Sequence, residues 1–449
     1  MSELKTVIEK VKSVIEETKL LPHDSGTQHV TGEAIYINDI DGGKLELKGR
    51  VVYSPYAHAK ILSFDLSEAR KVPGVHAVLS YKDIPGENQM GPVVHDEKCL
   101  AEGEVLCVGQ AMFLIAAETE TQAIEAERKI KVEYEQLKAI LDIETAIREN
   151  STIGVPRVIE RGKPEEAMLK AKHRLRGTLR TGAQEHWYLE TQSALCIPGE
   201  EKEMIVFASS QNPSETQAIV AQVLGVPRNE VVCEVRRMGG GFGGKETNGN
   251  HVAAWAALLA FHTKRPVKLH LFRDDDQKIT GKRHRFLSHY EVGFDETGKI
   301  ISYILELNAD AGIASDLSMS ILERGVFHAD NAYWIPNIKV KGRCLKTNLP
   351  SNTAFRGFGA PQGIAVIEHV VDRIARFLGK DPAEVRKINF YGENENNTTH
   401  YEQIVENNRL HKIYDKILTS SDYYNRRKVI NEFNHKNKFI KKGIALTPV

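Results

Sequence analysis

The residues best suited to chemistry lie in one glycine-rich segment, Arg236-Arg-Met-Gly-Gly-Gly-Phe-Gly-Gly-Lys-Glu-Thr247. Five glycines in six positions allow backbone N–H groups to turn inward and approach a ligand without interference from Cβ atoms. Glu246 adds an ionised acceptor at the exit of the segment. A tight structural turn is the alternative, but so dense a run favours a binding site for an electronegative group.

A second constellation surrounds Arg356 in Thr347-Asn-Leu-Pro-Ser-Asn-Thr-Ala-Phe-Arg-Gly-Phe-Gly-Ala-Pro-Gln362. An arginine held among aromatic residues and glycines suits recognition of a planar, oxygen-bearing anion, because its fork of donors is rigid. A surface salt bridge is the alternative. Together, Glu246 and Arg356 indicate an acceptor and a donor for a polar heterocycle. Gln211 follows an apolar strand and precedes a helix, which suits either a ligand-facing amide or a cap.

Two nucleotide-binding motifs overlap the glycine segment. Gly239-x-Gly241-x-x-Gly244 matches the dinucleotide fingerprint, and a strand over 267–272 with Asp274 follows it. Asp274 lies 30 residues past Gly244, which is later than a ribose-binding acid should fall. A phosphate loop needs Ser or Thr after the lysine, and Glu246 stands there instead, so that motif is strongly disfavoured. A Rossmann-like nucleotide-binding module remains an open alternative.

The elements that position these residues can be predicted from periodicity and caps. A strand over 230–235 leads into the glycine segment and a helix over 251–262 leads out, so the positive end of a helix points at the loop. Asn212-Pro-Ser-Glu215 predicts a helix start in which Glu215 reaches back to the cap, and Gly225 ends that helix. Asp381-Pro-Ala-Glu384 predicts a similar start, with Gly392 as its end.

The rest of the chain indicates at least two domains. The β-rich runs that precede residue 148 alternate with helical patterns and predict an α+β unit, which a larger α/β unit over about 157–400 follows. The polar stretch Glu149–Pro156 is the candidate linker between them. The remaining predicted elements are an amphipathic helix over about 1–20, strands over 34–37, 45–53, 75–79, 112–116, 130–134 and 204–207, a helix over 120–128, and polar helices over 401–443.

Bulk properties exclude several classes of protein. Lys plus Arg equals Asp plus Glu at 60 each, so the chain lacks the basic excess typical of nucleic-acid or anionic-membrane binding. The charged start and the lack of a long apolar run predict a cytoplasmic protein without a secretory signal or membrane span. The cysteines are scattered, so we expect reduced core thiols and no iron–sulfur cluster on this chain. His58, His186 and His369 have no ligand-like spacing and are interpreted as structural.

With these motifs in view, the chain resembles the molybdenum hydroxylases, the family of xanthine dehydrogenases and aldehyde oxidases. The resemblance rests on Gly239–Glu246, on Gln211-Asn before it and on Asn352–Gln362 after it. Shorter matches extend it along nearly the whole chain; they are Thr31–Tyr36, Ser54–Lys60, Lys71–Gly74, Cys107–Gln110, Glu185–Glu190 and Lys346–Pro350.

The resemblance implies a fold and a domain order. An N-terminal helix (1–24) would precede a small α/β hammerhead domain (25–150) and the first molybdopterin cofactor-binding domain (151–400), giving an α+β and α/β architecture. A helical connector (401–449) would follow, and Lys442–Val449 resembles the opening strand of a second cofactor-binding domain. In the family, that next domain carries the catalytic glutamate base. We therefore expect a chain that is incomplete alone and works in an oligomer with 2Fe-2S and FAD modules on partner chains or missing regions.

The resemblance also implies residue roles. Gln211 would lie beside the molybdenum, with Phe242 near the metal through its backbone and Gly241 and Gly243 holding the molybdenum–molybdopterin cofactor. Glu246 and Arg356 would orient the substrate as catalytic residues. Leu349 would form a pocket wall, and Phe390 would stack on the substrate ring. Ile388 stands where the family commonly has an arginine, which puts one polar cofactor contact in question.

The charged pair distinguishes the two branches of the family. Glu246 and Arg356 in an apolar aldehyde pocket would each lose hydration without gaining a partner. They favour a polar purine, and hence oxidative hydroxylation of hypoxanthine and xanthine to urate in purine catabolism, with water as the oxygen source. An aldehyde oxidase-like activity is the alternative within the family.

Overall fold

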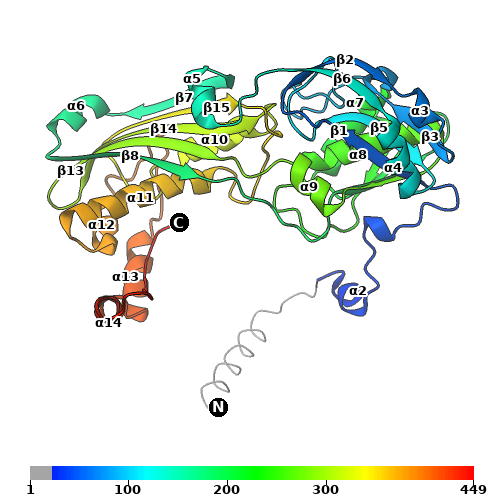
Figure 1. Cartoon of the computed structure of the whole chain (residues 1–449). Helices are drawn as coiled ribbons and strands as arrows, with labels where there is room; N and C mark the ends of the chain where they lie inside the picture. The colour runs from blue at the N-terminus through cyan, green and yellow to red at the C-terminus, as the bar shows by residue number, and fades with distance from the viewer. Residues whose placement is uncertain (1–22) are drawn as a thin grey trace.

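The computed structural model describes residues 23–449, so the helix expected near the N-terminus lies outside the described residues. Figure 1 shows two lobes, each built on its own large sheet, with helices α13 (Leu410–Ser420) and α14 (Tyr423–Lys436) projecting below one of them. The fold is mixed α and β, as the sequence predicts.

A seven-stranded sheet forms the first lobe. Helix α8 (Asn248–Thr263) packs against it beside α7 (Pro213–Leu224), and α8 is apolar nearly all round, as suits a helix inside a core. Smaller helices α3 (Ser67–Arg70), α4 (Glu120–Lys129) and α9 (Arg273–Ile279) belong to the same lobe. The strand order is β11 (Val231–Glu234), β10 (Met204–Ala208), β9 (Ser193–Pro198), β12 (Val267–His270), β1 (Leu47–Tyr53), β5 (Ala111–Ala117) and β3 (Val75–Leu79).

This sheet crosses the boundary expected between the two domains. Strand β1, from the N-terminal part, pairs in parallel with β12, from the cofactor-domain part, through registers such as Leu47 with Val267. The N-terminal part adds its own three-stranded sheet of β4 (Glu104–Val105), β2 (Ala59–Asp65) and β6 (Lys131–Gln136). The two units are therefore joined by continuous backbone hydrogen bonding.

The second lobe is a five-stranded sheet covered by helices. Helix α11 (Ala360–Leu378) buries one apolar face on it, and α10 (Ser318–Phe327), α12 (Pro382–Asn389), α5 (Ile143–Arg148) and α6 (Pro164–Lys170) pack around it. The strand order is β7 (Thr152–Arg161), β15 (Asn337–Lys346), β14 (Ile300–Gly312), β13 (Phe286–Phe294) and β8 (His173–Thr181).

Several predicted elements are confirmed with small shifts in their bounds. Helix α7 begins after Asn212, whose side chain accepts a hydrogen bond from the Glu215 N–H, and it ends at Gly225, where φ is +65°. The Glu215 carboxylate does not reach back to the cap, because it accepts a hydrogen bond from Asn250 Nδ2 at 2.8 Å. Helix α12 begins after Asp381 as expected but stops at Asn389, before Gly392.

Two local predictions are wrong, and a third stays a prediction. The stretch Glu149–Pro156 is no linker, because it runs into edge strand β7, where proline is tolerated. Residues 34–37 form no strand, because the Tyr36 N–H is bonded by the Asp39 carboxylate and a short 3-10 turn follows. The Lys442–Val449 segment joins no sheet of the described residues, and its Ile444 and Leu446 pack on the second core; its expected role as the opening strand of a further domain stays a prediction.

The dinucleotide alternative conflicts with the topology. The strands that flank α8 are β11 and β12, and β10 and β9 lie between them in the sheet, with β9 antiparallel to both of its neighbours. A dinucleotide-binding unit needs a crossover between neighbouring parallel strands and a tight turn into its helix. Here the whole segment 235–247 separates β11 from α8.

Candidate cofactor and substrate site

The glycine loop, residues Gly239–Lys245, is built around the side chain of Gln211. The Gln211 Oε1 atom accepts hydrogen bonds from the Gly243 N–H at 2.8 Å and the Lys245 N–H at 3.3 Å, and the Gln211 N–H donates to the Lys245 carbonyl at 2.8 Å. A Cβ at Gly241 would overlap Gln211 Oε1, so a larger residue there would displace the Gln211 amide. The loop therefore fixes the Gln211 amide, and its Nε2 donor has no partner within residues 23–449.

The loop turns through the left-handed region three times. The φ angles are +94° at Gly240, +53° at Phe242 and +98° at Gly243. Phenylalanine seldom adopts such a conformation, which costs on the order of 1–3 kcal/mol and persists only where surrounding contacts enforce it. The Phe242 ring is also 49% exposed. A strained, half-exposed aromatic residue is typical of a functional loop.

Three consecutive backbone donors of the loop are free. The N–H groups of Gly240, Gly241 and Phe242 make no hydrogen bond to any other residue of the described chain. Unpaired amides in a loop whose φ angles change sign can form a concave donor surface for an anion or an oxo group. With the Gln211 amide beside them, these donors fit a cofactor rich in electronegative atoms.

The Arg356 segment lies directly against the glycine loop. The Arg356 N–H donates to the Phe242 carbonyl at 2.9 Å, and a Cβ at Gly243 would stand 2.8 Å from the Ala354 carbonyl carbon. His186 joins the two segments, because its Nε2 lies 2.7 Å from the Ala354 carbonyl oxygen and its ring stacks on Phe355 at 4.5 Å between centroids. The structure therefore brings together two motifs that are over a hundred residues apart.

The two charged residues of these segments have no internal partners. Glu246 is half-buried, and its carboxylate accepts no hydrogen bond from residues 23–449. Burial, followed by the nearby Glu215 carboxylate, raises the pKa of Glu246. Arg356 is exposed, and its guanidinium makes no ion pair or hydrogen bond with the described residues. Both groups are thus available to a ligand.

Leu349 lies near the same end of the second sheet. It is half-buried, and its carbonyl accepts a hydrogen bond from the Ile313 N–H at 3.0 Å. The next two residues, Pro350 and Ser351, line a small cavity. The role of Leu349 as a pocket wall stays a prediction.

Phe390 is not part of this site, and its expected stacking role is wrong. The side chain is 5% exposed and packs in the core, stacked on Tyr333 and edge-on to Tyr414. Its neighbour Asn389 accepts a hydrogen bond from the Ile300 N–H, at the start of β14, whereas the Asn352 N–H bonds Ala311 near the end of β14. Strand β14 has 13 residues, so roughly 40 Å separates the two ends.

The structure adds a donor that the sequence motifs do not reveal. Arg324, on α10, is exposed, and its guanidinium has no partner among the described residues. It lines an open cavity of about 1530 Å³ together with Gly357, Ala360 and Pro361, which follow Arg356. The sequence motifs do not identify Arg324, because it stands in an amphipathic helix whose single adjacent glycine, Gly325, belongs to no recognisable binding motif.

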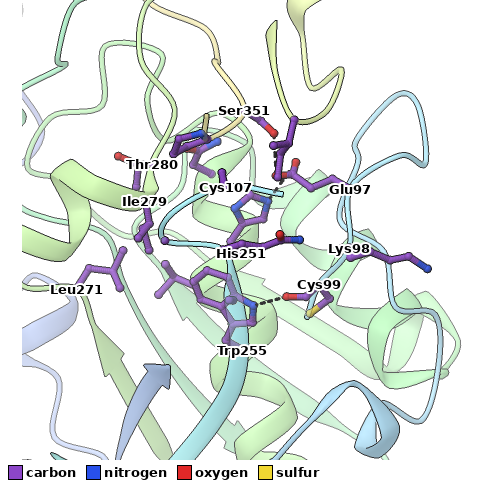
Figure 2. Close-up of a pocket in the computed structure, with 17 residues that line it drawn as sticks. Glu97, Lys98, Cys99, Cys107, His251, Trp255, Leu271, Ile279, Thr280 and Ser351 are labelled. Atoms are coloured by element: carbon purple, nitrogen blue, oxygen red, sulfur yellow. Dashed lines mark hydrogen bonds and ion pairs between the residues drawn. The ribbon is translucent and has the colours of Figure 1, made fainter. Parts of the chain in front are cut away.

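The cavity that Pro350 and Ser351 line is too small for a cofactor. Figure 2 shows Glu97, His251, Trp255 and Ser351 around it, between a loop of the N-terminal part and the start of α8. Its volume of about 40 Å³ suits one or a few waters. Ser351 Oγ donates to Glu97 at 3.0 Å, and burial raises the pKa of Glu97 to about 7 and lowers that of His251 to about 4.

The remaining candidates have structural surroundings. Four of the five cysteines are buried and none is in a disulfide, as expected for core thiols. His58 Nδ1 contacts the Lys138 carbonyl, and His369 packs edge-on to Tyr290. Among residues 23–449, no three His, Cys, Asp or Glu side chains form a group that could hold a metal ion. None of the described helices is long and apolar enough to cross a membrane.

These contacts define a site in which loop amides and a fixed glutamine are available to a ligand. Residues 147–390 match the molybdopterin cofactor-binding domain, and residues 31–138 match the a/b hammerhead domain of aldehyde oxidase and xanthine dehydrogenase. The chain belongs to the molybdopterin-dependent family of xanthine dehydrogenases and aldehyde oxidases.

Similar proteins agree with this assignment. The chain is 44% identical to a xanthine dehydrogenase of Dictyostelium discoideum over 96% of its own length and 31% of that protein. It is 46% identical to a xanthine dehydrogenase of Calliphora vicina, over 95% of its length and 32% of that protein. The chain thus spans about a third of the length of these relatives.

Solved structures share the fold over almost the whole chain. The aldehyde oxidoreductase of Desulfovibrio gigas superposes with a TM-score of 0.83 at 26% identity, over 93% of this chain and 47% of that one. That of Desulfovibrio desulfuricans gives a TM-score of 0.85 at 26% identity, over 92% and 48% of the two chains.

Proposed function

We propose that this chain forms the part of a xanthine dehydrogenase that binds the molybdenum–molybdopterin cofactor and orients a purine for oxidative hydroxylation. The observation that carries the proposal is the half-buried Glu246 carboxylate, which has no partner within residues 23–449 and directly follows a loop with three amides that are free within the same residues. The relatives named xanthine dehydrogenase, at 44–46% identity, support the same branch of the family.

The loop would hold the cofactor by its electronegative atoms. The N–H groups of Gly240, Gly241 and Phe242 and the Gln211 amide are the available donors, and Gly241 and Gly243 allow their close approach. When bound, the cofactor supplies an oxygen atom that derives from water and accepts the electron pair of the oxidised C–H bond. Iron–sulfur and flavin modules, on partner chains or other regions, would carry those electrons onward, and the glutamate base of the family would come from a further domain.

Glu246 and Arg356 would orient the purine. An ionised Glu246 accepts a ring N–H, and Arg356 donates to a ring oxygen and offsets the negative charge that develops during oxidation. Each charge-assisted contact is worth on the order of 1.5–3 kcal/mol, which corresponds to about 10- to 150-fold in rate or affinity. Arg324 is a second candidate for the donor role because it lines the cavity next to the Arg356 turn.

Steady-state kinetics of the molybdenum-loaded holoenzyme test the proposal. Glu246→Gln, Arg356→Met and Arg324→Met would each be assayed with xanthine and with a small aldehyde. We expect the first two variants to lose about 10- to 150-fold in kcat/KM for xanthine at unchanged molybdenum content. A loss of kcat/KM for xanthine in Arg324→Met but not in Arg356→Met would show that Arg324, and not Arg356, is the donor.

The aldehyde assay separates the two branches of the family. Removal of a charge from an apolar aldehyde pocket should leave aldehyde turnover unchanged or raise it, since no polar substrate atom loses a partner. A fully loaded wild-type enzyme that oxidises the aldehyde and not xanthine would refute the purine assignment.

A further inference from the structure

The side chain of Lys245, the last residue of the glycine loop, is buried. Neither the proposed cofactor contacts nor the proposed substrate contacts involve this side chain. Lys245 has no exposed surface. Its Nζ donates to the Glu190 carbonyl at 2.7 Å, to Ser209 Oγ at 2.7 Å and to Glu190 Oε2 at 3.2 Å. It also lies 4.6 Å from the centre of the Tyr188 ring. All three ammonium protons therefore have acceptors.

Its partner Glu190 holds the opposite end of the same loop. Glu190 Oε2 accepts a hydrogen bond from the Gly239 N–H at 2.7 Å and another from Ser209 Oγ at 2.7 Å. The Glu190 N–H donates to the Gly239 carbonyl at 3.2 Å. One carboxylate oxygen thus connects the first residue of the loop, Gly239, with the last, Lys245.

The Gly244 carbonyl, next to the last residue of the loop, is anchored on the same side. Gln192 Nε2 donates to the Gly244 carbonyl at 3.1 Å and to the Tyr188 hydroxyl, which in turn donates to Asp276 at 2.7 Å. Contacts to the protein interior therefore occupy both ends and one carbonyl of the loop. The amides of residues 240–242, which have no partner in the described chain, are the donors that remain.

A buried ion pair is a poor device for stability alone, because two charges lose their hydration. Its value lies in geometry, since both partners must keep their hydrogen bonds in one arrangement. Burial lowers the pKa of Lys245, and the Glu190 carboxylate opposes that shift. The hydrogen bonds between Lys245 and Glu190 can form only while the two loop ends keep their spacing.

We propose that Lys245 and Glu190 are positioning residues that set the spacing of the loop ends and thereby aim the free amides and the Gln211 side chain at the cofactor. This inference rests on the proposed cofactor binding of the chain. Neither residue touches the cofactor or the substrate in this assignment, so their effect passes through the loop backbone.

The test uses Lys245→Met and Glu190→Gln in the holoenzyme. Two readouts are measured on folded protein: hydrogen exchange of the amides of residues 239–245, and the rate at which molybdenum is lost during dialysis. We expect both rates to rise at least about 10-fold in each variant, with the xanthine KM of the enzyme that remains loaded unchanged. Ser209→Ala, which removes one hydrogen bond from each partner, should give a smaller change in the same direction.

Lys71→Met is the matched control, because Lys71 is exposed and pairs with Glu68 at 2.7 Å far from the loop in sequence. It should leave both rates unchanged. If Lys245→Met does not fold, Glu190→Gln carries the test, since glutamine keeps the size of the side chain and can still accept from Gly239.

The outcomes separate this inference from the proposed function. Unchanged hydrogen exchange over 239–245 in the variants would overturn the inference. Faster exchange with unchanged molybdenum retention would also overturn it, because the loop would then be held without consequence for the cofactor. A wild-type protein that takes up no molybdopterin would instead refute the proposed function, and with it the cofactor part of the inference.

Discussion

The two ends of the second sheet differ in how their polar and aromatic groups are used. Near the end of β14, the Asn352–Arg356 segment meets the glycine loop, with free amides, a strained Phe242 and two charges without internal partners. At the start of β14, aromatic rings stack on one another, and the buried Arg386 pairs with Glu368 at 2.7 Å. One end has unused hydrogen-bonding capacity, and the other has almost none.

This difference teaches how to recognise a site. Phe390 and Phe242 are both phenylalanines in motifs of the same family, but only Phe242 is exposed and has a positive φ. Unused donors and backbone strain identify a place where a ligand completes the structure. Aromatic character alone does not, because most aromatic residues serve a core.

The largest expected effect is the difference in stability between two variants in which each phenylalanine is replaced by alanine. Phe390→Ala should destabilise the protein by about 3–5 kcal/mol, because it empties a packed site in the core. Phe242→Ala should change stability by no more than about 0.5 kcal/mol, since its ring is half-exposed. Chemical denaturation of the two variants measures the contrast. Similar losses in both would mean that the two ends of the sheet do not differ as described.

A smaller effect is expected at Gly243. An alanine there keeps the φ of +98° and brings its Cβ to 2.8 Å from the backbone of Ala354, so we expect a loss of about 2–3 kcal/mol together with weaker cofactor retention. Gly103→Ala is the control, because Gly103 also has a positive φ, of +75°, but nothing within 4 Å of the added Cβ. Thermal unfolding of Gly103→Ala should show a loss of stability of about 1–2 kcal/mol. Equal losses of stability in Gly243→Ala and Gly103→Ala would show that the close approach of Gly243 to Ala354 does not matter.

A modest gain in stability is expected from Glu246→Gln in the cofactor-free protein. Burial raises the folded-state pKa of Glu246, so folding favours the protonated carboxyl. The ionised carboxylate therefore costs folding stability near neutral pH. The neutral glutamine removes that cost, and it should impair the proposed purine reaction. A variant that is less stable than the wild type at pH 7 would show that the carboxylate has a stabilising partner.

The smallest effect is the pH dependence of the same substitution. The wild-type protein gains stability from protonated Glu246 below the unfolded pKa, and it loses that gain as the pH rises through the raised folded pKa. The difference between Glu246→Gln and the wild type should therefore grow as the pH rises from about 4 toward neutral and then level off. Denaturation series at several pH values measure it, and a difference that is constant with pH would contradict the shift.

Local signals in the sequence account for much of the fold and part of the site. Caps locate the starts of α7 and α12, and Gly225 locates the end of α7, because these signals act within a few residues. The glycine loop is recognisable because closely spaced glycines allow backbone conformations that other residues rarely adopt. Lys245 and Glu190 are missed because their meaning arises only when residues far apart in the chain meet in a buried space. Phe390 is misassigned because exposure, which separates a stacking ring from a core ring, has no signature in one motif.

The same limit explains the false linker. Gly154 and Pro156 signal a break, but an edge strand tolerates proline, and β7 pairs only with β15. A sequence window shows turn-forming residues, and it does not show which sheet edge lies beside them.

The pairing of β1 with β12 has a consequence for any attempt to study the parts alone. A polypeptide cut between the two family domains would leave β12 with a bare row of N–H and C=O groups along a flat apolar face, and β1 would be left in the same state. Such edges recruit other chains. Separately produced halves should therefore aggregate rather than remain monodisperse. Co-expression of both halves should prevent this aggregation by restoring the pairing of β1 with β12.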